Sequence, residues 1–302
     1  MPLFPASSTG HDRPLIAIAY MLAAVLFFTA QSGLTKWLVA SIPVNEIVFF
    51  RHAFALVPAF WMLGKSGGIA SLKTRRIGMH LFRLAGGMSS MTLGFLALAL
   101  IPVADVTAYS FAAPLLITAL SVPLLGEQVG PHRWSAVVAG FIGVLIMVRP
   151  GTGAIQPGAL VALAATLGSA VVALTMRQLG HTETTASIVV TYSGLAGIVS
   201  GLTLPFWWVT PNWLELAALA ILGLGGGAAQ YWYTKALNLA PVSVISPLNY
   251  TGLIWAVLMG YVFWGEVPEQ STLVGALIIV ASSLYILYRE TVRRAERARA
   301  PR

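Results

Sequence analysis

Residues 86–127 read GGMSSMTLGFLALALIPVADVTAYSFAAPLLITALSVPLLGE, and residues 225–266 read GGGAAQYWYTKALNLAPVSVISPLNYTGLIWAVLMGYVFWGE. The two stretches align without a gap at a constant offset of 139 (225 − 86), and nine of the 42 paired positions are identical. The identities include an in-register Gly-Gly, Pro-Val and Gly-Glu, which an apolar composition alone rarely produces. We therefore predict that the chain contains an internal duplication.

Apolar runs of helical length extend from this repeat along the whole chain. A bilayer core requires about 20 apolar residues per helix. Ten runs are near that length: 15–36, 44–64, 77–100, 103–125, 131–148, 158–177, 185–206, 214–237, 242–264 and 272–288. Each half then contains five runs, an odd number, so the second half must cross the membrane in the opposite direction. Inverted repeats of this kind are typical of secondary transporters, with the substrate site near the midplane between the halves.

The composition also indicates a membrane environment. Of the 302 residues, 57% are hydrophobic and 9% are charged, against roughly 25% charged residues in an average soluble domain. The mean hydropathy is +0.81, and the apolar runs have the length of helices rather than of barrel strands. We expect an all-α integral membrane protein with ten transmembrane helices arranged as two inverted five-helix repeats.

The basic residues determine the expected orientation. The net charge is +8, but the basic residues lie between the apolar runs and in the tail, so they form no nucleic-acid-binding patch. With the N-terminus inside, 14 of the 18 Lys and Arg residues are cytoplasmic and two lie on the other side. The positive-inside rule then predicts that both termini are cytoplasmic. The expected organisation is a lead at 1–14, a first repeat at 15–149, a second repeat at 157–288 and a basic cytoplasmic tail at 289–302.

Several motifs resemble the EamA-type domain of the drug/metabolite transporter superfamily. They are Arg83-Leu-Ala-Gly-Gly through Gly126-Glu127, Trp134 to Pro150, Gly225 to Gln230, Trp264-Gly-Glu266 and Gly275-Ala-Leu-Ile. The stretch Phe50-Arg51-His52-Ala53 agrees as well, because the family often has an arginine in the second span. The resemblance implies two inverted five-helix bundles in the bacterial inner membrane. It leaves the substrate open, because the family includes exporters of amino acids and drugs and importers of vitamins and nucleoside-like metabolites.

Polar and aromatic residues inside the spans are the candidates for a substrate site, because polar groups are expensive in a bilayer. Thr107 and Ser110 share one helical face of the fourth span. Asn249 and Tyr250 lie on the corresponding stripe of the ninth span. The other candidates are Gln31, Gln230, Tyr233 and Trp255. Tyr and Trp rings beside an amide suit a flat heterocycle, while packing and interhelical hydrogen bonds are the alternative role for all of these residues.

Three charged residues complete the predicted site as charge partners. Arg51 lies about 10 Å into the second span, where it either braces helix ends or binds the substrate. Arg83 is expected to snorkel, with its guanidinium at the cytoplasmic surface. Glu46 begins the second span and is expected to pair with Lys36.

Signatures of other chemistries are absent from the sequence. No phosphate-binding loop of the Gly-x-x-x-x-Gly-Lys-Ser/Thr type occurs, which excludes ATP-driven transport within this chain. The five histidines have no metal-ligand spacing and there is no cysteine, so we expect no metal, no cofactor and no enzymatic reaction. A membrane-embedded enzyme and a channel are the alternatives from other classes.

The sequence therefore predicts a secondary transporter that moves a small organic molecule across the lipid bilayer by alternating access. The aromatic and amide candidates favour import of a heterocyclic metabolite, with riboflavin preferred over S-adenosylmethionine. Export of amino acids or drugs is the alternative. The direction of transport, the coupling ion and a homodimer stay open, and no nucleic-acid partner is expected.

Overall fold

The computed structural model describes residues 14–65, 68, 72, 74, 76–126, 129–149, 156–179, 182–240 and 242–299. Within these residues the chain is helical and contains no strand. The helices of the first half are α1 (Pro14–Leu38), α2 (Val44–Lys65), α3 (Ile77–Leu100), α4 (Val103–Ser110), α5 (Ala113–Leu125) and α6 (Pro131–Val148). Those of the second half are α7 (Pro157–Leu179), α8 (Thr185–Gly201), η2 (Leu204–Phe206), α9 (Trp213–Leu239), α10 (Val242–Ile245), η3 (Ser246–Thr251), α11 (Gly252–Trp264) and α12 (Gln270–Arg299).

The prediction of ten spans is confirmed. Nine apolar helical segments in the described part of the chain are long enough to cross a membrane. The tenth span is 242–264, which the structure divides into α10, η3 and α11. The fourth span is also broken, by a turn at Phe111 and Ala112 between α4 and α5. Thr107 and Ser110 both lie in α4, before this break.

The two breaks occur at equivalent positions of the repeats, because Phe111 and Ala112 pair with Tyr250 and Thr251 of η3 at the offset of 139, although the nearby prolines are not repeat mates. Pro114 stands in the first turn of α5 and Pro247 in the first turn of η3. A proline lacks the N–H that would continue the preceding helix, and it is well tolerated at a helix start.

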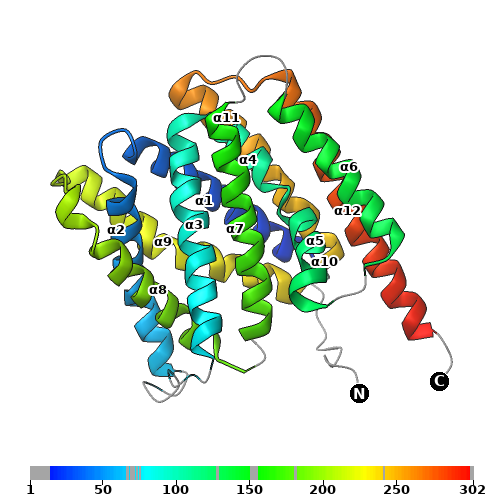
Figure 1. The fold of residues 1–302 in the computed structure, drawn as a ribbon, viewed down its shortest axis with the longest axis horizontal. Coiled ribbons are helices and arrows are strands. Elements are labelled where there is room, and N and C mark those ends of the chain that lie inside the picture. The colour runs from blue at the N-terminus through cyan, green and yellow to red at the C-terminus, as the bar shows by residue number, and fades with distance from the viewer. Residues whose placement is uncertain are drawn as a thin grey trace.

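Helix packing follows the symmetry of an inverted duplication. The pair α3–α7 corresponds to the pair α1–α9 after exchange of the halves, and both pairs pack closely. The pairs α2–α8, α4–α11 and α6–α12 are each formed by one helix and its own repeat mate. In Figure 1, α6 and α12 lie side by side along one edge of the bundle. Gly126 and Gly265, which are repeat mates, end their helices with φ angles of 67° and 66°, in the left-handed region that favours glycine.

The bundle has two ends in Figure 1: an upper end, where α4 and α12 begin, and a lower end, where α3 begins. At the upper end Lys36 pairs with Glu266 of the second half and donates to the carbonyl oxygen of Ile101 at 3.0 Å. Glu46 instead accepts a hydrogen bond from the Val209 N–H at 3.0 Å. The predicted Lys36–Glu46 pair is therefore wrong, because Lys36 reaches across to the other half of the bundle.

The lower end is held by a different set of contacts. His80 of α3 lies 2.6 Å from a carboxylate oxygen of Glu183, and Thr74 donates to the other oxygen. Arg76 donates to the carbonyl oxygen of Gln178 at 3.4 Å. These contacts also join the two halves, so both ends of the bundle are closed by polar interactions between the repeats.

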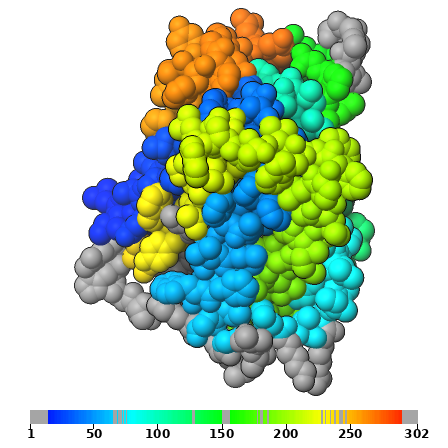
Figure 2. All heavy atoms as spheres, turned by 90° about the vertical axis from the view of Figure 1, so that its left-hand side faces the viewer, coloured from blue at the N-terminus to red at the C-terminus, as the bar shows by residue number. Residues whose placement is uncertain are grey.

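The outer surface is apolar. Figure 2 shows the face where α2 lies beside α8 and the α8–α9 connection. On these segments Trp61, Ile198 and Phe206 are 65%, 63% and 75% exposed. Large apolar side chains at this exposure are costly in water and suit contact with lipid.

Candidate functional site

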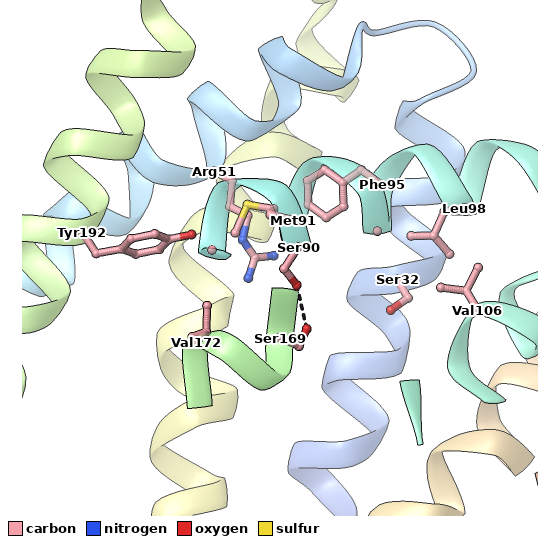
Figure 3. A pocket seen from close by; sticks show the side chains of 12 residues that line it. Ser32, Arg51, Ser90, Met91, Phe95, Leu98, Val106, Ser169, Val172 and Tyr192 are labelled. Atoms are coloured by element: carbon pink, nitrogen blue, oxygen red, sulfur yellow. Dashed lines mark hydrogen bonds between the residues drawn. The ribbon is translucent and has the colours of Figure 1, made fainter. Parts of the chain in front are cut away.

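A cavity of about 390 Å³ lies between the two halves. Its walls come from α1, α2, α3 and α4 of the first half and from α7 and α8 of the second half. The residues that line it are Ser32, Arg51, Gly87, Ser90, Met91, Gly94, Phe95, Leu98, Val106, Ser169, Val172 and Tyr192. Figure 3 shows their side chains converging from these helices. A cavity of this position and size fits a small-molecule site between inverted repeats.

Arg51 is the charged residue of the cavity wall. Its guanidinium lies 5.9 Å from the centroid of the Phe95 ring, and Figure 3 shows it in the middle of the cavity. It forms no ion pair with the described part of the chain. A guanidinium presents its N–H groups as a planar fork, which matches a carboxylate or a phosphate. The cavity therefore presents N–H donors and a positive charge of the kind that bind anionic groups.

Arg51 lies close to α9 at Gly226. A Cβ atom added at Gly226 would lie 3.9 Å from the Arg51 Nη2 atom and 3.8 Å from the Gln31 Nε2 atom. Gln31 in turn donates to the carbonyl oxygen of Leu222 at 3.0 Å. The first and second spans thus approach α9 at this level, at distances of ordinary van der Waals contact.

Tyr192 forms another wall and packs against a guanidinium and an imidazole ring. The guanidinium of Arg83 lies 4.1 Å from its ring centroid, and the His52 ring stands perpendicular to it at 5.1 Å. A Cβ atom at Gly87 would lie 2.6 Å from the Tyr192 hydroxyl oxygen, so only glycine leaves space for the ring. Arg83 is 7% exposed. The prediction that it snorkels to the surface is wrong, because it stacks on Tyr192 inside the bundle.

Hydroxyl groups supply the neutral polar contacts. Ser90 of α3 and Ser169 of α7 are joined by a hydrogen bond of 2.6 Å between their oxygens, drawn as a dashed line in Figure 3. Ser32 of α1 donates to the carbonyl oxygen of Phe28 at 3.3 Å. The cavity thus combines one cation, two aromatic rings and a few hydroxyls, which can bind an organic molecule with an anionic group and a ring system.

Comparison with known proteins gives the family. The model of the EamA-like transporter family matches residues 15–149 and 156–288, one match for each half. The chain belongs to the EamA-like transporter family. Its fold of two inverted repeats and its membrane spans are those expected from the resemblance in the sequence, and the activity of the family is transport rather than catalysis.

Several relatives of this EamA-like transporter have named activities. An S-adenosylmethionine uptake transporter of Rickettsia felis is 30% identical over 91% of this chain and 94% of its own length. A riboflavin transporter of Rhizobium johnstonii is 28% identical over 93% of this chain and 94% of its own length. A pseudopaline exporter of Pseudomonas aeruginosa is 27% identical over 89% of this chain and 96% of its own length. These relatives agree that the chain is a multi-pass membrane transporter with a small-molecule substrate.

A solved crystal structure shares the fold of this EamA-like transporter. It superposes with a TM-score of 0.63 at 20% identity and covers 90% of this chain and 98% of its own. At this identity the likeness concerns the fold alone.

The residues that the sequence nominated for the site of this EamA-like transporter are dispersed in the structure. Arg51 lines the cavity, while Thr107 donates to the Val103 carbonyl oxygen at 2.8 Å and Ser110 to the Thr107 carbonyl oxygen at 2.6 Å. Such bonds within one helix satisfy the hydroxyls without a ligand.

The nominated residues of the eighth and ninth spans lie elsewhere in the bundle. The Tyr250 ring contacts Phe111, and the Tyr233 ring lies 6.4 Å from that of Phe28. Trp255 is half-buried against α1, and Asn249 is half-buried in η3. The side chain of Gln230 is outside the described part of the chain. For all of these residues a role in binding stays a prediction.

Tyr192, Phe95, Ser90 and Ser169 were missed by the sequence analysis. None of them stands out in the sequence, because each is a single polar or aromatic residue in a mostly apolar helix. The available signal was glycine: Gly87 lies three residues before Ser90 and Gly94 four residues after it on α3, and this helix face lines the cavity.

Proposed function

We propose that this chain takes up a heterocyclic metabolite that carries a carboxylate, with S-adenosylmethionine as the first candidate. The observation that carries the proposal is Arg51, whose guanidinium occupies the cavity between the halves without an acidic partner in the described part of the chain. A carboxylate of the substrate supplies that partner. Binding between two inverted halves also suits alternating access, because either half can move relative to the site.

The aromatic walls support the heterocyclic part of the proposal. Phe95 and Tyr192 line the same cavity as Arg51. A planar ring can stack on or meet the edge of such side chains, and the volume of about 390 Å³ lies within the roughly 300–1,000 Å³ of small-molecule sites.

The structure changes the order of the candidate substrates. Riboflavin has a ring system but no carboxylate, whereas S-adenosylmethionine has both a ring system and an amino-acid carboxylate. The unpaired cavity arginine therefore favours S-adenosylmethionine, which is also the named substrate of the relative from Rickettsia felis. Riboflavin is the second candidate, on account of the relative from Rhizobium johnstonii.

The orientation belongs to the same proposal. At the lower end of the bundle, where α3 and α6 begin, Arg76 directly precedes α3 and Arg133 lies in the first turn of α6, so the positive-inside rule assigns this end to the cytoplasm. Both termini are then cytoplasmic, in the inner membrane of a bacterial cell, and the upper end with Lys36 and Glu266 faces outward.

The test is counterflow in proteoliposomes that contain the purified chain. Vesicles are loaded with unlabelled S-adenosylmethionine, and entry of external labelled S-adenosylmethionine is followed over time. We expect saturable entry that excess S-adenosylmethionine suppresses and that decarboxylated S-adenosylmethionine suppresses at least about 10-fold less effectively, since a hydrogen-bonded charge contact contributes about 1.5–3 kcal/mol.

Riboflavin and aromatic amino acids serve as competitors in the same assay. If riboflavin exchanges and S-adenosylmethionine does not, the carboxylate proposal fails and riboflavin takes its place. If neither enters by a saturable route, the heterocycle proposal as a whole is wrong. The direction of net transport is read separately, from accumulation in vesicles of known orientation.

A further inference from the structure

Arg83 is a second buried cation, and it lies outside the cavity wall. Its Nε atom donates to the sulfur of Met176 at 3.0 Å, and its Nη1 atom is buried without a hydrogen-bond partner in the described part of the chain. It forms no ion pair there either. A thioether sulfur is only a weak acceptor, so the positive charge of Arg83 is poorly compensated.

His52 adds a second unused polar atom at the same level. His52 is 3% exposed, and its Nε2 atom is buried without a partner among the described residues. Both His52 and Arg83 pack against the ring of Tyr192, at 5.1 Å and 4.1 Å respectively. Arg51 is also within electrostatic range of the two rings. Donors and positive charge therefore gather around Tyr192 from α2 and α3.

The carboxylate that contacts the adjacent turn of α3 comes from the α7–α8 connection and is already engaged. One carboxylate oxygen of Glu183 contacts His80, which lies one turn before Arg83 on α3. The other oxygen accepts a hydrogen bond from Thr74. The Tyr192 ring offers Arg83 a cation–π contact, but such a contact offsets only part of the cost of removing a guanidinium from water. The remaining cost is what a bound anion would offset.

We propose that Arg83 and His52, packed on Tyr192, form a second anion site that is separate from the cavity arginine Arg51. The ligand is a small monovalent anionic group, either a free halide or a carboxylate. The guanidinium donates through its Nη1–H, and neutral His52 donates through Nε2–H in the corresponding tautomer. The site is small because α2, α3 and α8 pack tightly there, with Gly87 giving its space to the Tyr192 ring.

An anion at this site would reduce the net positive charge beside the cavity. A cationic or zwitterionic substrate could then approach Arg51 with less repulsion. The site itself does not depend on which substrate is transported, so it can be tested on the protein without any substrate.

The experiment measures thermal unfolding of the purified full chain in detergent. The sodium salts of chloride, acetate and gluconate are compared at equal ionic strength, with gluconate as the anion too large to enter. We expect chloride or acetate to raise the unfolding midpoint of the wild type by at least about 2 °C over gluconate, with saturation. Arg83→Gln should abolish this difference between the salts. Arg83→Met, which keeps an apolar stem beside Met176, should abolish it as well.

Two controls locate the effect. Lys235→Gln removes an exposed cation that lies 5.6 Å from the Tyr231 ring centroid and should keep the full anion dependence. Arg51→Gln should also keep the response that depends on Arg83, because the cavity arginine is a different site. An acetate response that only Arg51→Gln removes comes from the cavity. Loss of the dependence in Arg51→Gln with retention in Arg83→Gln would overturn the assignment.

The salts also distinguish the two sources of the anion. A response to chloride alone identifies a free halide, and a response to acetate alone identifies a carboxylate group. Equal midpoints for the wild type in all three salts would overturn the proposal, and this outcome does not depend on whether the variants fold. The counterflow assay is independent of it, so failure of the substrate proposal leaves this result intact.

Discussion

The rings of Phe111 and Tyr250 meet edge to face, with their centroids 5.0 Å apart and their planes at 85°. The two residues occupy equivalent positions of the two repeats (250 − 111 = 139). Contact between equivalent residues places this pair on the pseudo-twofold axis that relates the halves. Each residue also stands at the break of its span, after α4 and before α11. The pair therefore joins the two broken spans at their centres.

Removing this aromatic pair should loosen the contact between the halves. We expect Phe111→Ala and Tyr250→Ala each to destabilise the protein by about 2–4 kcal/mol, because each leaves a cavity. The coupling energy in a double-mutant cycle should be about 0.5–1.5 kcal/mol, the typical value for an aromatic pair. Unfolding in detergent measures all four variants. A coupling near zero would mean that the rings meet without stabilising the interface.

Arg51 should determine recognition of the carboxylate. Arg51→Gln is expected to raise the KM for S-adenosylmethionine about 10- to 100-fold, as expected when a charged hydrogen-bonding group is lost. Decarboxylated S-adenosylmethionine should be transported equally by wild type and variant. Lys235→Gln, which lowers the net charge by the same amount at an exposed site, controls for the general change in charge. An equal loss for both compounds in Arg51→Gln would contradict a role in carboxylate binding.

The Lys36–Glu266 pair should hold the upper end closed. The two side chains are 12% and 20% exposed, and Glu266 also accepts from the Val103 N–H at 3.3 Å. Glu266→Gln should therefore raise the population that is open at this end. The measurement is the rate at which an impermeant maleimide labels Ser32→Cys in the cavity wall, which we expect to increase severalfold.

The labelling measurement is specific to the introduced cysteine and has a matched control. The chain contains no cysteine, so the introduced thiol is the single reactive group. Glu269→Gln is the matched control, since the Arg149–Glu269 pair at the same end is 43% and 55% exposed and such a surface pair contributes about 0–1 kcal/mol. Equal labelling rates in wild type and Glu266→Gln would show that the pair does not limit access to the cavity.

The contact between α6 and α12 depends on two glycines. A Cβ atom at Gly143 would lie 2.8 Å from the carbonyl oxygen of Gly275, a backbone atom that cannot turn away. Gly143→Ala should destabilise the protein by about 1–3 kcal/mol, as overpacking does. Gly194→Ala, where nothing lies within 4 Å, should instead be neutral or stabilising by up to about 1 kcal/mol. The unfolding midpoints of the two variants are compared by thermal unfolding. Similar midpoints would contradict this packing argument.

The orientation can be tested with the same chemistry. Val267 in the upper connection is 70% exposed and Ile77 at the lower end is 56% exposed. In intact cells, we expect an impermeant maleimide to label Val267→Cys and to label Ile77→Cys only after the cells are opened. The reverse pattern would place the termini outside and contradict the positive-inside assignment.

The number and extent of the spans could be read from the sequence, because a bilayer imposes length and hydropathy on each helix separately. The inverted arrangement followed from counting five runs per repeat. The glycines at 126 and 265 were visible as repeat mates, and both occupy the left-handed conformation that ends a helix. The breaks at Phe111 and before Gly252 were harder to foresee, since proline in a span is compatible with a kink, a break or neither.

Contacts between helices could not be read in the same way. Lys36 has Glu46 close in sequence, yet it pairs with Glu266 from the other half. Arg83 has enough reach to snorkel, yet it lies on Tyr192 from α8. In both cases the deciding partner is more than 100 residues away along the chain, and hydropathy carries no information about which helices become neighbours.

The sequence by itself determined the class of this protein: ten apolar spans, two inverted halves and a family of membrane transporters. These properties depend on local composition and on the repeat, both of which are present in the linear chain. Only the tertiary structure decided the site, because Arg51, Phe95, Ser169 and Tyr192 meet in one cavity only after four separate helices pack together. Helix periodicity shows which face of a helix is polar, but packing between faces of similar shape and hydropathy selects the neighbour, and with it the chemistry of the cavity.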